Sequence, residues 1–167
     1  MLIKSLALFS FLSFVGLFIL ACRPEVNVET KVAADDAETF AYDSTLAAKL
    51  GADDYGMKKY VMTFLKAGPN QDQDSAAAAQ LQRAHMDNIF LLADEGILSV
   101  AVPFLDGGEL KGIYVFNVGT IEEARALTET DPAIKAGRLV MELHPWYGSA
   151  AMMMLNDWHK KVQKKEI

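Results

Sequence analysis

Between residues 57 and 146, strand-like and helix-like patterns follow one another in an order that few folds accommodate. Alternating apolar residues predict four strands, and apolar residues at helical spacing predict two helices. The strands are expected over 59–66, 97–104, 110–118 and 138–144, and the helices over 76–95 and 120–128. This order is typical of an α+β, ferredoxin-like βαββαβ fold, in which a four-stranded antiparallel sheet carries both helices on one face.

Two helices cover only one face of such a sheet, yet the first predicted strand is apolar on both. Tyr60, Met62 and Phe64 point to one face of this strand. Val61 and Leu65 alternate with them and point to the other face. A large apolar face rarely stays in water. We therefore expect a homodimer formed sheet against sheet.

The segment between the second helix and the fourth strand places a carboxylate beside the sheet. Asp131 suits a helix N-cap, Pro132 suits the first turn, and Gly137 can end this short helix in a left-handed conformation. The long helix carries His85 on the apolar stripe that faces the sheet. Periodicity alone favours a buried structural histidine. If His85 and Asp131 meet, however, the carboxylate fixes the ring tautomer and the other ring nitrogen can move a proton.

Residues 1–22 are predicted to be an export signal. Lys4 supplies a positive start, residues 6–20 are nearly all apolar, and the segment ends at Ala21 and Cys22. This pattern resembles a bacterial lipoprotein signal that is cleaved before Cys22 and lipidated on its sulfur. An uncleaved anchor is the alternative, since about 20 apolar residues also span a bilayer. Both interpretations predict a protein held at a membrane of the bacterial envelope, and the lipoprotein signal predicts that it faces outside the cytoplasm.

Residues 23–54 are predicted to be a flexible tether, residues 55–150 the folded domain and residues 151–167 a helical tail. A short helix over 44–50 is compatible with the tether. The tail carries an apolar stripe, formed by Ala151, Met154, Leu155, Trp158 and Val162, followed by several lysines. This helix is expected either to dock on its own domain or to touch a membrane surface as a basic amphipathic helix.

Composition excludes several classes of function. The net charge of -6 gives no electrostatic basis for nucleic-acid binding. Cys22 is the only cysteine, which excludes an intramolecular disulfide and any multi-cysteine metal site. A metal site built from His85, His144 and a carboxylate is the weaker alternative, because the three histidines include no pair four residues apart. We expect no metal and no cofactor.

Several short segments occur in the order of a known family. They are Lys59-Tyr60-Val61-Met62, Ala84-His85-Met86, Pro103-Phe104-Leu105-Asp106, Phe116-Asn117-Val118, Ile121-Glu122-Glu123-Ala124, Thr130-Asp131-Pro132, Ala136-Gly137 and Glu142-Leu143-His144-Pro145-Trp146. Through them the chain resembles the YCII-related domain family, whose fold is a dimeric α+β barrel. The resemblance implies a site made of His85 and Asp131. The family usually has a glycine before the proline of the second strand, where this chain has Val102; if that glycine leaves room for a ligand, the pocket here is narrower.

Two hypotheses for function follow. In the first, a membrane-tethered protein uses a catalytic His85–Asp131 dyad for proton transfer, of lyase or isomerase type, on a small organic molecule. No serine or cysteine nucleophile stands in a recognisable motif, which disfavours acyl transfer. In the second, a non-catalytic envelope protein binds a small ligand or only assembles as a dimer, and the same pair is a structural hydrogen bond.

Overall fold

The computed structural model describes residues 41–165, so the predicted signal, Cys22 and most of the predicted tether lie outside the described residues. The strands are β1 (Met57–Ala67), β2 (Leu98–Pro103), β3 (Leu110–Phe116) and β4 (Leu139–Ser149). The helices are α1 (Ser44–Leu50), α2 (Ser75–Asp94), α3 (Ile121–Thr128), α4 (Pro132–Lys135) and α5 (Leu155–Val162), with a 3₁₀ segment η1 (Ala150–Met154) before α5.

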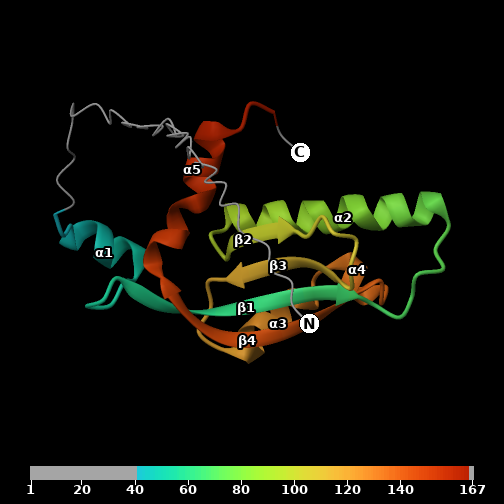
Figure 1. Cartoon of the computed structure of the whole chain (residues 1–167), viewed down its shortest axis with the longest axis horizontal. Helices are drawn as coiled ribbons and strands as arrows, with labels where there is room; N and C mark the ends of the chain where they lie inside the picture. The colour runs from blue at the N-terminus through green and yellow to red at the C-terminus, as the bar shows by residue number, and fades with distance from the viewer. Residues whose placement is uncertain (1–40, 166–167) are drawn as a thin grey trace, which may run out of the picture. The chain divides into compact units, whose positions relative to one another are not determined.

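The four strands form one antiparallel sheet in the order β2-β3-β1-β4 (Figure 1). The two central strands, β3 and β1, are therefore not adjacent in the sequence. In the register of the sheet, Thr63 of β1 lies between Tyr114 of β3 and Leu143 of β4. The α+β, ferredoxin-like fold and the extra C-terminal helix are confirmed.

The hydrophobic core lies between the sheet and the helices α2 and α3. Its fully buried members are Val61, Leu65, Leu92, Leu98, Tyr114, Phe116 and Ala124, drawn from all the strands except β4 and from both helices. Leu139, Met141 and Leu143 of β4 pack against its edge. The alternation predicted for the first and fourth strands is confirmed, because these side chains face the helices while their neighbours face the other way.

Local capping explains where the helices begin and end. The side chain of Asp74 caps α2 by accepting a hydrogen bond from the amide of Ala77, and Thr120 with Glu123 forms a capping box at α3. Gly137 follows α4 with φ of +69°, and an added Cβ there would lie 2.7 Å from the Asn70 side chain. The left-handed conformation therefore favours glycine at this position, and a larger residue would also have to displace the Asn70 amide.

Two segments differ from the expected boundaries. Strand β4 does not end at His144 but continues through Pro145 to Ser149. This is possible because β4 is an edge strand paired only with β1, where a missing amide donor breaks no ladder. The tail, expected as one helix, divides into the 3₁₀ segment η1 and the α-helix α5.

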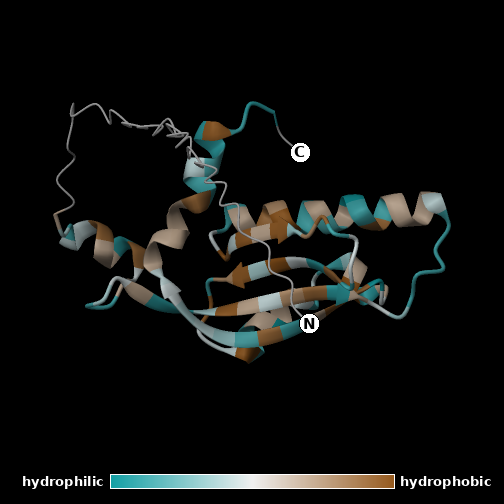
Figure 2. Ribbon diagram, in the orientation of Figure 1, coloured by the Kyte–Doolittle hydropathy of each residue, from teal (hydrophilic) through white to brown (hydrophobic). Residues whose placement is uncertain are grey.

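The face of the sheet away from α2 and α3 is only partly covered by the described residues. Tyr60 and Val115 are buried on this face, while Val102 and Val140 are 50% and 41% exposed. Brown, hydrophobic segments recur along the strands in Figure 2. Among residues 41–165, no helix is both long and apolar enough to cross a bilayer.

Candidate functional site

His85 and Asp131 meet in the interior. His85 Nδ1 lies 2.6 Å from Asp131 Oδ2, and the two residues are 7% and 0% exposed. His85 lies on helix α2, which packs over the sheet, and Asp131 lies in the turn between α3 and α4. Because a carboxylate only accepts hydrogen bonds, Nδ1 must carry the hydrogen, which leaves Nε2 as the nitrogen able to exchange a proton.

Asp131 is held in place by its own helix. Its second oxygen, Oδ1, accepts a hydrogen bond of 2.8 Å from the amide of Ala133, as an N-cap does. The predicted Asp131 cap and the Pro132 first turn are thus confirmed. One carboxylate serves both the helix and the histidine, so its orientation is fixed at both oxygens.

Tyr114 is a third member of the site that the sequence analysis missed. Its hydroxyl lies 3.3 Å from His85 Nε2, and the two rings are nearly parallel, at 19°. Burial, and secondarily the negative charge of Asp131, hold the pKa of the Tyr114 hydroxyl well above its usual range. Tyr114 is therefore a neutral hydrogen-bond donor. The available signal was a tyrosine on the core-facing side of its strand, since a buried phenol needs a polar partner.

The two hydrogen bonds of His85 are unequal. The 2.6 Å contact to Asp131 is short, as expected for a charged acceptor, whereas 3.3 Å is long for a bond donated by a hydroxyl. The ring is therefore clamped on its Nδ1 side and loosely held at Nε2.

Thr63 places a buried hydroxyl that lacks a hydrogen-bond partner beside Tyr114. It is completely buried, it lies directly opposite Tyr114 in the sheet, and its Oγ1 has no hydrogen-bond partner. It is the one buried side-chain nitrogen or oxygen without a partner among the described residues. Such groups are uncommon in folded proteins because leaving one unpaired costs free energy.

Two residues considered at the sequence level lie on the opposite face of the sheet. His144 pairs with Met62 and bonds to Glu142 at 2.8 Å, so the sheet separates it from His85. Within residues 41–165, no group of three potential metal ligands gathers. Val102 pairs with Ile113 on that same outer face, so it does not narrow the space beside His85.

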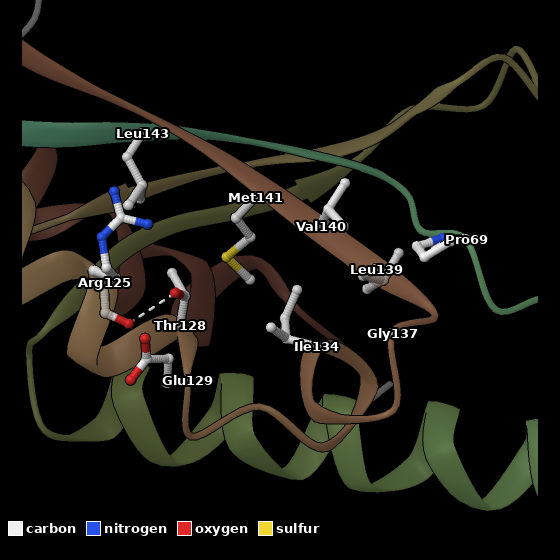
Figure 3. Close-up of a pocket in the computed structure, with 10 residues that line it drawn as sticks. All are labelled: Pro69, Arg125, Thr128, Glu129, Ile134, Gly137, Leu139, Val140, Met141 and Leu143. Atoms are coloured by element: carbon white, nitrogen blue, oxygen red, sulfur yellow. Dashed lines mark hydrogen bonds between the residues drawn. The ribbon is translucent and has the colours of Figure 1, made fainter.

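A surface cavity of about 280 Å³ lies between β4 and the α3–α4 segment (Figure 3). It is lined by Pro69, Arg125, Thr128, Glu129, Ile134, Gly137, Leu139, Val140, Met141 and Leu143. A second hollow, between the Tyr60 and Trp146 ends of β1 and β4, is about 380 Å³. Neither is lined by His85 or Asp131, whose side chains are 9% and 1% exposed.

No protein-family model matches the chain, and no curated protein matches it. Among solved structures it is similar to a 5-chloro-2-hydroxyhydroquinone dehydrochlorinase from Burkholderia phenoliruptrix AC1100, in complex with 2,5-dihydroxybenzoquinone. The identity is 19% and the TM-score 0.41, over 52% of this chain and 92% of the other. At this distance the similarity assigns no activity, and the resemblance to the YCII-related family stays a prediction.

Proposed function

We propose that this chain is a membrane-tethered protein that transfers a proton on a small organic molecule, with His85 as the acid–base group. One observation carries the proposal: a buried histidine is clamped by a carboxylate at Nδ1 and only loosely held at Nε2. Asp131 orients the ring and balances the charge that it gains. Tyr114 completes the set as a neutral donor beside the exchanging nitrogen.

A carbon acid next to a carbonyl group suits this arrangement. His85 Nε2 accepts the proton from carbon, and the electron pair moves onto the carbonyl oxygen. The Tyr114 hydroxyl then turns from Nε2 to donate to that oxygen, where negative charge develops. Returning the proton to another carbon gives isomerisation, and loss of a leaving group from the neighbouring carbon gives elimination. The free Thr63 hydroxyl supplies a further contact for a polar substrate atom.

A non-catalytic role is the second candidate, and one observation favours it. His85 and Asp131 already have hydrogen-bond partners at all their polar side-chain atoms, and neither lines the two cavities described above. In this alternative the pair ties α2 to the α3–α4 turn, and the protein binds a small ligand or only assembles.

Proton exchange in D₂O separates the two candidates. Small carbonyl compounds, pyruvate and cyclohexanone among them, are followed by NMR as their α-protons are replaced by deuterium. We expect the wild-type chain to accelerate exchange of at least one compound, and His85→Gln to lower that rate by about 10²–10⁴-fold.

His144→Gln is the matched control, because His144 is half exposed on the other face of the sheet. It should leave the exchange rate unchanged. Equal rates for wild type and His85→Gln, or no exchange above buffer, would favour the non-catalytic role.

Two further features belong to the proposal. A lipid on Cys22 would hold the domain at an envelope membrane, which the apolar segment ending at Ala21-Cys22 supports. A homodimer would cover the partly exposed outer face of the sheet. The half-exposed Val102 and Val140 support this pairing, because apolar side chains there gain most from a second sheet.

A further inference from the structure

The C-terminal helix α5 turns its apolar side outward. Leu155, Trp158 and Val162 recur at helical spacing on one stripe and are 48%, 53% and 77% exposed. Amphipathic helices of globular domains ordinarily bury such a stripe. In Figure 2 the hydrophobic segments of α5 alternate with hydrophilic ones along its length.

The polar side of α5 makes the contacts with the domain. The Asn156 amide donates to the carbonyl of Leu98 at 2.8 Å, and Lys160 pairs with Asp94 at 3.0 Å. At about 100° per residue, Asn156 and Lys160 lie roughly 150° around the helix from the apolar stripe. Asn156 is also the only residue of α5 that is partly buried. The helix is therefore attached by its polar side, and the described residues leave about half or more of each stripe side chain exposed.

The charge around the stripe is opposite to that of the whole chain. Residues 155–167 contain Lys160, Lys161, Lys164 and Lys165 against Asp157 and Glu166, a net charge of +2, while the full sequence carries -6. The Lys161 ammonium lies 4.3 Å from the centre of the Trp158 ring, so a cation and an indole are presented together. This combination suits an interface with anionic headgroups above and acyl chains below.

We propose that the outward stripe of α5, formed by Leu155, Trp158 and Val162, docks on an anionic lipid surface with Lys161 at the headgroups, while Lys164, just beyond the helix, adds to the positive charge near that surface. The apolar side chains enter the headgroup boundary, and the indole sits where aromatic residues concentrate in membrane proteins. The acidic remainder of the chain is repelled from the same surface, which orients the domain with α5 toward the lipid. This contact is independent of an anchor at Cys22.

Vesicle co-sedimentation tests the proposal with residues 23–167, which lack both the signal and Cys22. This chain retains the entire core, because the buried apolar residues lie between Tyr60 and Ala150. Vesicles of phosphatidylcholine alone are compared with vesicles that also contain phosphatidylglycerol. We expect binding to the anionic vesicles only, with a blue shift of tryptophan emission that Trp158→Ser abolishes.

The variants separate the stripe from general surface effects. Trp158→Ser should lose binding, whereas Leu105→Ser, which removes a 93% exposed leucine in the β2–β3 loop, should retain it. Reversing Lys161 and Lys164 to Glu should weaken binding more than tenfold, since each basic residue near an anionic surface contributes roughly fivefold.

The double reversal of Lys49 and Lys135 is the charge-matched control and should have little effect. The proposal is overturned if wild type binds neither vesicle, binds both equally, or binds no more strongly than the Trp158→Ser variant. It is also overturned if Trp158→Ser alters self-association without lipid but leaves vesicle binding intact.

Discussion

Replacing Asp131 separates its structural role from its chemical role. In Asp131→Ala, α4 loses its cap, at a cost of about 1 kcal/mol. The buried His85 Nδ1–H also loses its acceptor, at a cost of about 1–3 kcal/mol. Together the free energy of unfolding should fall by about 2–4 kcal/mol. Urea unfolding measures this change.

Asp74→Ala is the matched control, because Asp74 caps α2 through one amide at 2.8 Å but has no buried histidine as partner. It should cost only about 1 kcal/mol. The difference between the two variants isolates the contribution of the His85 contact. If Asp131→Ala is no more destabilising than Asp74→Ala, the buried pair contributes nothing and the reasoning is refuted.

Asp131→Asn should preserve the stability of the fold but abolish the ability of His85 to accept a proton. The Asn oxygen still caps α4, while its amide nitrogen now donates to His85 Nδ1. The ring hydrogen must therefore move to Nε2, which can no longer act as a base. We expect an unfolding free energy within about 1 kcal/mol of wild type. Nitrogen-15 NMR of the ring should report the changed tautomer, and an unchanged ring spectrum would contradict the geometry.

Three other predictions concern the rest of the chain. Cys22→Ser should release the protein from the membrane fraction of cells, and retention there would point to an uncleaved anchor. Residues 23–167 should sediment as a dimer at micromolar concentration, and Phe64→Asp on the outer sheet face should shift them to monomer; a monomeric wild type would exclude the sheet-to-sheet pairing. The hydrogen bond from the Tyr147 hydroxyl, more than that from the Met57 amide, lowers the pKa of Asp53 below its usual value. The stabilisation of the fold by ionised Asp53 is therefore present above the pKa that Asp53 has in the unfolded chain, and it is lost as pH falls through the pKa that Asp53 has in the folded chain. Tyr147→Phe should flatten the decline of unfolding free energy on acidification, and identical acid titrations would exclude this contribution.

The sequence predicted the fold because its local signals agree with one another. Strand periodicity, the Asp131 cap and the helix-ending Gly137 all favour the same arrangement, and each has a short-range physical cause. The contact between His85 and Asp131 could be predicted from the sequence for the same reason. One residue lies on the sheet-facing stripe of α2 and the other at a fixed turn above the sheet.

What the sequence could not predict depends on contacts between distant elements. Tyr114 fits an apolar strand pattern, and only the packing of α2 over β3 places its hydroxyl at His85. The continuation of β4 through Pro145 requires an edge position that periodicity does not reveal. The stripe on α5 was visible in the sequence, but its outward direction follows from the Asn156 contact to Leu98.

A crystal structure of residues 23–167 grown with cyclohexane-1,3-dione tests the central claim most directly, because the enolate of this compound mimics the charge developed during proton transfer. We expect one of its oxygens within hydrogen-bond distance of His85 Nε2 and the Tyr114 hydroxyl, with those two groups moved apart from their 3.3 Å separation. An interior with no bound molecule and the His85–Tyr114 contact unchanged would contradict the proposed role of His85.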